Sequence, residues 1–317
     1  MTLLDTPKAA QPAQDQAGNL RRLFQNGGET PVLRETPPAP VRLPAEPPAP
    51  TRRARTIAIT SGKGGVGKTN LAVNLAACFA RADKRTLLID ADMGLANADV
   101  ICGLDLRHNL AHVIARRLSF ADVIATGPGG FRLVAGASGL ARMADLPAEE
   151  HERLLRGLRS LERAHDLILI DTGAGISPNV LSFTASADGV LVVTTPEPTA
   201  ITDAYATIKV ILRGRPDAPI SLLVNEAKNA HEAAGVYERM AATARRFLDA
   251  DLADAGWVPI DPAVSRAVRR RKPFVLDQPN SGASRALVRL AGRLTSGVGD
   301  AASTSNSSGF FGRVLRR

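Results

Sequence analysis

The sequence has few cysteines, few aromatic residues and no long apolar run, and each shortage excludes a class of protein. Cys78 and Cys102 are the only 2 cysteines in 317 residues, too few by themselves for a disulfide framework or a structural zinc site. Both lie in apolar surroundings, which predicts buried thiols in a reducing cytosol. No apolar, uncharged run reaches the length of about 18 residues that a membrane-spanning helix needs. The N-terminus lacks a basic region followed by an apolar one, so no signal peptide is expected.

Aliphatic residues compensate for the scarcity of aromatic ones. Aromatic side chains account for 4% of the chain, whereas hydrophobic residues reach 44%. With that apolar content, 317 residues can bury the core of one large domain or two small ones. Cores rich in Ala, Val, Leu and Ile favour an α/β fold over an all-β sandwich.

The net charge of +9 is concentrated at the C-terminal end. Residues 264–317 carry 11 Lys or Arg against 2 Asp or Glu, whereas residues 56–263 carry 21 against 24. A polyanionic partner would therefore meet the C-terminal end. The alternative is a solvated basic helix that only aids solubility.

A proline-rich stretch, residues 27–54, follows a short N-terminal segment, residues 1–26. Its composition predicts an extended, flexible linker. Within the N-terminal segment, Leu20, Leu23 and Phe24 have the i, i+3, i+4 spacing of an amphipathic helix. Because so short a helix is marginal alone in water, we expect a peptide that folds on a partner. The alternative is a helix packed on its own domain.

Beyond Arg55, short apolar runs alternate with helical patterns. Strands are predicted at residues 56–60, 86–90, 167–171, 190–194, 220–225 and 257–260, and helices at residues 70–81, 148–165, 199–213, 230–250 and 282–294. This alternation predicts an α/β domain over residues 55–294, with a doubly wound, mostly parallel sheet and helices on both faces. A second flexible linker, residues 295–308, then leads to a C-terminal segment, residues 309–317.

A glycine-rich turn after the first predicted strand has the phosphate-binding pattern G-x-x-x-x-G-K-[ST]. Glycines let the backbone wrap a phosphate chain with inward-pointing N–H groups, at a helix N-terminus that stabilises negative charge. We expect Lys68 to reach the β- and γ-phosphates and the Thr69 hydroxyl to bind Mg²⁺. The predicted nucleotide-binding residues of this loop are Gly62, Lys63, Gly64, Gly65, Val66, Gly67, Lys68 and Thr69.

An additional lysine, Lys63, stands at the second position of this loop and gives the sequence KGGVGKT, which resembles the deviant Walker A motif of the MinD/ParA family of ATPases. In that family the extra lysine crosses a dimer interface and touches the nucleotide of the other subunit. The resemblance implies ATP and Mg²⁺ as ligands, an ATP-dependent homodimer and slow hydrolysis that resets it. Lys63 and Lys68 would be catalytic. The alternative for Lys63 is a solvated loop lysine.

Three aspartates are predicted at the carboxyl ends of strands, where open parallel sheets bind their ligands. Asp90 and Asp92 follow one strand, and Asp171 ends another. By resemblance, Asp171 is the Walker B residue that holds Mg²⁺, Asp90 belongs to the same metal shell, and Asp92 positions the attacking water. Such positioning is sufficient chemistry for phosphoryl transfer. Gly173 and Gly175 predict a segment that moves with the γ-phosphate.

The expected base is adenine. Guanine-specific P-loop proteins carry N-K-x-D after a strand, whereas the equivalent place here, Asn225 to Lys228, has the asparagine but no aspartate. Asn225 is therefore a predicted base contact. By resemblance, Pro259 and Asp261 frame the ring.

Three segments, TPEPTAITDAY, DADMGLANAD and LILIDTGAGIS, narrow the resemblance to the FlhG/FleN group of MinD-like regulators of flagellar number and placement. The resemblance covers about residues 55–294. Residues 15–21, DQAGNLR, also resemble the D-Q-A-x-x-L-R element with which this group stimulates the signal-recognition-particle-type GTPase FlhF. Gln16 would then act at the GTP site of FlhF. The docking face of this element would comprise Leu20, Leu23 and Phe24.

The C-terminal segment has one apolar side. At about 100° per residue, an arc of about 140° contains Phe310, Phe311, Val314 and Leu315. This resembles a short MinD-type membrane-targeting helix in the headgroup region, here on the cytoplasmic face of the inner membrane. Two copies in an ATP dimer would gain avidity. The alternative is a disordered basic tail.

Together the resemblances imply a switch ATPase whose output depends on its partners. Besides FlhF, these include flagellar basal-body switch proteins and the flagellar master transcription activator. Direct DNA binding is not expected, because the basic cluster at residues 266–272 has no interleaved aromatic platform. The alternatives are a ParA-type DNA-partitioning ATPase that uses residues 264–272, a MinD-type division-site ATPase and a catalytically idle scaffold.

Overall fold

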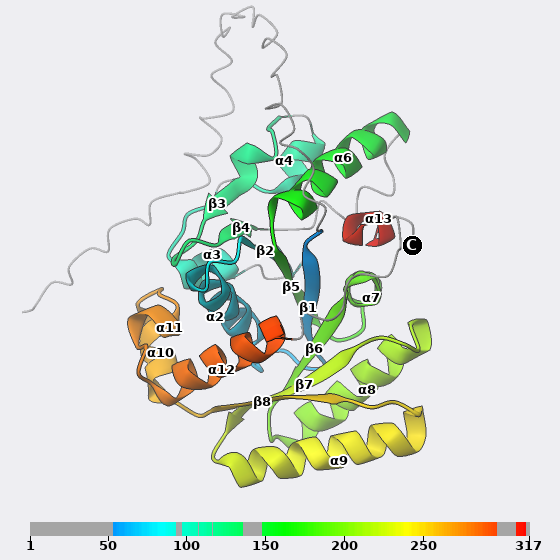
Figure 1. Ribbon diagram of the computed structural model, residues 1–317, viewed down its shortest axis with the longest axis vertical. Coiled ribbons are helices and arrows are strands. Elements are labelled where there is room, and N and C mark those ends of the chain that lie inside the picture. Colours follow the sequence, from blue (N-terminus) through cyan, green and yellow to red (C-terminus); the bar gives the residue numbers. More distant parts are fainter. Residues whose placement is uncertain are drawn as a thin grey trace, which may run out of the picture. The chain divides into compact units, whose positions relative to one another are not determined.

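The computed structural model describes residues 53–92, 97–106, 108–115, 117–135, 148–296 and 309–314. The strands are β1 Arg55–Ser61, β2 Thr86–Ala91, β3 Ile124–Thr126, β4 Arg132–Val134, β5 Leu167–Ala174, β6 Gly189–Thr194, β7 Ile220–Ala227 and β8 Ala253–Pro259. They form one eight-stranded sheet in the order β3-β4-β2-β5-β1-β6-β7-β8 (Figure 1). All neighbours pair in parallel except β3 and β4, which are antiparallel.

Helices cover both faces of this sheet. They are α2 Lys68–Arg81, α3 Ala98–Cys102, α4 Leu110–Ile114, α6 Ala148–Ala164, α7 Pro178–Ser186, α8 Pro198–Gly214, α9 Ala230–Leu248, α10 Pro262–Arg269, α11 Phe274–Asp277, α12 Gly282–Ser296 and α13 Phe310–Val314. On one face α2 packs against α3, α11 and α12. On the other face α7 packs against α8 and α13, and α8 packs against α9 (Figure 1).

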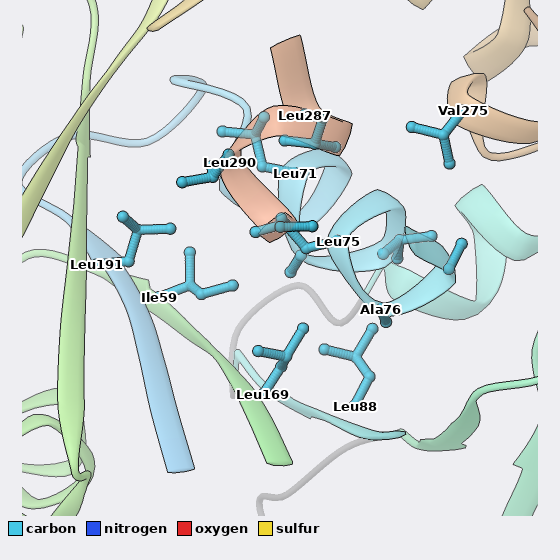
Figure 2. Close-up of a cluster of buried hydrophobic side chains, with 14 of the residues drawn as sticks. Ile59, Leu71, Leu75, Ala76, Leu88, Leu169, Leu191, Val275, Leu287 and Leu290 are labelled. Atoms are coloured by element: carbon cyan, nitrogen blue, oxygen red, sulfur yellow. The ribbon is translucent and has the colours of Figure 1, made fainter. Parts of the chain in front are cut away.

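Successive side chains of the central strands feed two separate apolar layers, because a strand alternates its faces. In β1, Ile59 belongs to the layer under α2 and α12, whereas Ala58 belongs to the layer under α6 and α7. Figure 2 shows the first layer, in which Leu75 of α2 and Leu290 of α12 converge with side chains of the sheet. A parallel sheet covered on both faces requires apolar residues at successive positions, which is what the runs in the sequence supply.

The predicted fold class is confirmed, and the ends of the central strands lie within a few residues of their predicted places. The prediction for the last strand is wrong at its start, since β8 begins at Ala253 rather than at residue 257. The strand is interrupted at Gly256, which has a φ of 95° and shifts the pairing with β7. This bulge breaks the alternation that sequence reasoning depends on. The elements β3, β4, α3, α4, α7, α10 and α11 were not predicted.

The C-terminal segment packs on the domain. Phe310 and Phe311 are fully buried, and the Phe310 ring stacks on Phe183 of α7 with 6.4 Å between centroids. The sequence predicted a linker and then an apolar arc facing lipid, whereas here α6 and α7 cover the part of the arc up to Val314. Leu315 lies outside the described residues. No helix within the described ranges is long and apolar enough to cross a membrane.

Candidate functional site

The loop between β1 and α2 has the backbone shape of a phosphate cradle. Gly67, directly before α2, has a φ of 88°, a left-handed conformation that strains larger residues. A Cβ on Gly62 would overlap the backbone of Asp203 in α8, so the loop and that helix can approach only because residue 62 is glycine. The N-terminus of the 14-residue helix α2 faces this turn. Backbone N–H groups and a helix dipole at one turn favour a polyphosphate.

Asp171 in β5 is fully buried beside the first residues of α2. Neither of its carboxylate oxygens makes a hydrogen bond of normal geometry within the described residues. Burial raises the pKa of Asp171 to about 7, and the nearby Thr69 hydroxyl and Lys68 ammonium oppose that rise. Two buried oxygens without a partner suit a hard cation such as Mg²⁺, with water and phosphate completing the shell. The residues present therefore fit the predicted metal.

Asp90, which pairs with Asp171 across β2 and β5, has its oxygens occupied. One oxygen accepts the backbone N–H of Asp92 at 3.1 Å, and the other accepts those of Asn97 and Ala98 at 3.0 and 3.1 Å. Burial raises its pKa, against the effect of these three N–H donors. Asp90 therefore holds the backbone at Asp92, Asn97 and Ala98.

The Asp92 carboxylate lies near Gly173, in the segment that the sequence predicts to move with the γ-phosphate. It is half-buried, and a Cβ on Gly173 would be 3.6 Å from its Oδ1. Gly173 lies on β5, two residues after Asp171. Asp92 and Asp171 therefore belong to one cluster at the carboxyl ends of β2 and β5.

Lys63 points away from this cluster to the segment that follows β6. Its Nζ lies 2.9 Å from Oε2 of Glu197 and 3.1 Å from the hydroxyl oxygen of Thr199. The Lys63 side chain remains 39% exposed and that of Glu197 61%. Glu197 and Thr199 were not predicted as contacts, although the carboxylate directly after a strand end in TPEPT was a visible signal.

Asn225 braces the phosphate loop. Its side chain is buried, and Nδ2 donates to the carbonyl of Val66 at 2.9 Å. The structure therefore assigns the Asn225 amide nitrogen to the phosphate loop, and its role as a base contact stays a prediction. Pro259 ends β8, on the far side of β7 from the loop.

Asp261 stands at the start of two helices. One oxygen accepts the N–H of Ala263 in α10 at 2.9 Å, and the other accepts that of Ala283 in α12 at 3.0 Å. A polar cavity of about 410 Å³ adjoins it, lined also by Arg266 and Asn280. None of the residues that line this cavity belongs to the phosphate loop, and the role of Asp261 at the base stays a prediction.

The structure thus brings Lys68, Thr69 and Asp92 close to Asp171, while Lys63 of the same loop contacts Glu197 and Thr199 instead. The predicted partner-binding residues Gln16, Leu20, Leu23 and Phe24 lie outside the described residues. Phe310, Phe311 and Val314 belong to a different region, under α6 and α7. No group of three or more His, Cys, Asp and Glu side chains in the described ranges forms a metal cage of its own.

Comparisons with known proteins agree with this geometry. Residues 54–215 match the family described as an AAA domain. The antiactivator FleN of Pseudomonas aeruginosa is 40% identical over 242 residues, 76% of this chain and 86% of FleN. The flagellum site-determining protein YlxH of Helicobacter pylori is 33% identical over 273 residues, 82% of this chain and 89% of YlxH. A solved MinC:MinD cell division complex from Aquifex aeolicus has a TM-score of 0.60 and 29% identity, covering 77% of this chain and 96% of that one.

Proposed function

Because the chain belongs to the MinD/ParA family of P-loop ATPases, which hydrolyse ATP, we propose that it is an ATP-dependent dimerising switch that controls flagellar number and placement. The similarity to the antiactivator FleN and the flagellum site-determining protein YlxH supports the flagellar assignment. The observation that carries the switch is the partly exposed lysine of the phosphate loop, Lys63, which is free of the cluster around Asp171.

In this proposal the phosphate loop binds ATP and the aspartates act on it. Lys68 would contact the phosphates, while Thr69 and Asp171 would hold Mg²⁺. When bound, Mg²⁺ neutralises charge on the phosphates. Asp92 would orient the attacking water, and its position beside Gly173 would let that segment respond to the γ-phosphate.

Lys63 would change partners when the dimer forms. An exposed ion pair such as Lys63–Glu197 contributes at most about 1 kcal/mol, because solvent screens it. A phosphate buried in a dimer interface offers a stronger, charge-assisted hydrogen bond. The exposed ion pair with Glu197 would therefore be weak enough for Lys63 to exchange it for a phosphate of the other subunit.

Replacing Lys63 by Ala is expected to preserve ATP binding but to abolish ATP-dependent dimerisation, because Lys68 remains while the contact across the interface is lost. Replacing Asp92 by Ala is expected to do the opposite and to trap the ATP dimer by slowing hydrolysis. Light scattering with and without ATP measures both effects. Lys84→Ala is the matched control, since Lys84 lies outside the loop. A fully dimeric Lys63→Ala protein would contradict the role of Lys63.

We also propose that residues 1–26 stimulate the GTPase FlhF. A side-chain amide can donate to and accept from an attacking water, so Gln16 would orient that water beside the γ-phosphate of GTP. Trans-acting groups accelerate phosphoryl transfer by up to ~10³–10⁵, and a glutamine should give much less. The apolar face of Leu20, Leu23 and Phe24 would hold the peptide on the partner.

A peptide of residues 15–26 is expected to raise GTP turnover by FlhF. Gln16→Ala should remove the stimulation and leave peptide binding nearly intact, because the docking face is unchanged. Leu23→Asp should remove both stimulation and binding. Turnover and binding are measured side by side for each peptide. Stimulation by Gln16→Ala equal to that of the unchanged peptide would leave the segment as an anchor only.

The third part of the proposal concerns α13. We infer that its packing under α6 and α7 is the closed state of a membrane-targeting helix, which leaves this groove in the ATP dimer. The support is the position of α7, which begins at Pro178, just beyond the segment that contains Asp171 and Gly173. A shift of that segment with the γ-phosphate would move one wall of the groove.

A further inference from the structure

Both ends of the folded domain meet at one buried carboxylate, that of Glu162 in α6. Its side chain is 3% exposed. One oxygen accepts the backbone N–H of Phe311 at 2.9 Å, and the other lies 3.1 Å from Nε of Arg53. The Glu162 carbonyl also accepts the N–H of Ala54 at 3.0 Å. The same residue therefore holds the first turn of α13 and the point at which the N-terminal part of the chain enters the fold.

A second carboxylate, that of Asp188 between α7 and β6, links the same two segments, and its side chain is 40% exposed. Its Oδ2 accepts both the backbone N–H and the hydroxyl of Thr56 at 2.8 Å. Its Oδ1 accepts Nη2 of Arg313 at 2.8 Å, and Arg313 also donates to the carbonyl of Ser186. Residues 53–56 and α13 are thus bound to each other through two acidic side chains, and α13 lies beside α6 and α7 (Figure 1).

The buried carboxylate of Glu162 is tolerated only while it keeps its partners, whereas the exposed carboxylate of Asp188 adds a weaker link that solvent screens. When α13 leaves, Glu162 loses the N–H of Phe311 and Asp188 loses Arg313. When residues 53–56 are displaced, the same two carboxylates lose Arg53 and Thr56. Each carboxylate contacts both residues 53–56 and α13. When one of these segments is lost, the carboxylate is less well oriented for the other.

We propose that Glu162 and Asp188 form a clasp that couples the docking of α13 to the seating of residues 53–56. Because coupling between two binding events is reciprocal, whatever displaces residues 53–56 also favours release of α13, and release of α13 loosens residues 53–56. The clasp rests on the proposed function only for its biological meaning. In the proposed function, binding of a partner to residues 1–26 and binding of α13 to an anionic membrane would favour each other.

Hydrogen exchange on the full, nucleotide-free chain tests the coupling directly. Arg53→Ala should speed amide exchange in α13 about 3- to 10-fold, although residue 53 is remote from α13 in sequence. Deleting residues 309–317 should speed exchange at Ala54 and Thr56 to a similar extent. Arg55→Ala is the matched control, because Arg55 donates to the carbonyl of Leu294 in α12 and not to the clasp. It should leave the exchange of α13 unchanged.

A double-mutant cycle assigns the effect to Glu162. In a Glu162→Gln background, Arg53→Ala should change the exchange of α13 less than twofold, because the shared anchor is already lost. Exchange in β6 serves as an internal reference for global unfolding. The clasp is overturned if Arg53→Ala and Arg55→Ala affect α13 equally, or if Arg53→Ala acts as strongly in the Gln background. Neither membrane binding nor GTPase stimulation enters the measurement, so failure of the proposed function is scored separately.

Discussion

Replacing Asp171 by Asn is expected to stabilise the nucleotide-free protein at pH 8 by about 2–4 kcal/mol while abolishing ATP hydrolysis. Burial raises the pKa of Asp171 from its ordinary value to about 7, so ionising this side chain costs on the order of 2–4 kcal/mol more in the folded protein than in the unfolded chain. An amide carries no charge and escapes this cost. Hydrolysis is lost because the proposed Mg²⁺ ligand is removed.

The stability difference between Asp171→Asn and wild type is expected to depend on pH. Because folding raises the pKa of Asp171, the stability that its protonated form contributes is fully present below about pH 4 and is lost as the pH rises through about 7. The advantage of Asp171→Asn should therefore shrink toward zero near pH 4. Denaturant unfolding without Mg²⁺ or nucleotide measures it. Asp217→Asn is the control, since that side chain is 84% exposed. Equal stability of wild type and Asp171→Asn at pH 8 would contradict the argument.

Gly309→Ala is expected to make the protein bind anionic vesicles without ATP, on the order of tenfold more tightly than wild type, which corresponds to about 1.4 kcal/mol. A Cβ at this position would overlap the Glu162 carboxylate, which Arg53 and the N–H of Phe311 hold in place. The substitution thus disfavours docking of α13 but leaves its apolar side chains intact. Sedimentation with phosphatidylglycerol-containing vesicles provides the measurement.

Two further proteins complete the vesicle experiment. Gly235→Ala is the matched control, because a Cβ there meets nothing within 4 Å, and it should still require ATP. Deleting residues 309–317 should abolish binding in every nucleotide state. If the truncated protein binds vesicles as well as wild type does, the membrane contact is made by the basic residues 266–272 instead of α13.

The sequence predicted what depends on local pattern. The phosphate loop, the strand ends that carry Asp90 and Asp171, and the long helices all follow from spacing and turn chemistry. The start of β8 did not, because Gly256 bends the strand through a conformation that no period reveals. The partner of Lys63 was also missed, because Glu197 is 134 residues away in sequence and only the fold brings the two together.

The C-terminal segment shows a different limit. The helical pattern predicts that Phe310 and Phe311 are covered by an apolar surface, but it does not identify that surface. Lipid and a groove between helices satisfy the same side chains. The groove exists only after α6 and α7 have folded around β5, so no local pattern in residues 309–317 contains it.

The two outermost strands determine how copies of this chain can and cannot associate. β3 is three residues long, which leaves little backbone for another strand to join. At the opposite margin the N–H of Gly256 is already taken by the Asp254 side chain at 2.7 Å, and β8 ends in Pro259, which has no N–H. Edge strands that are short, kinked or lack free N–H groups disfavour pairing between the sheets of different copies. The edge strands that the structure describes therefore offer little backbone to a strand of a second copy, which disfavours fibrous aggregation through the sheet.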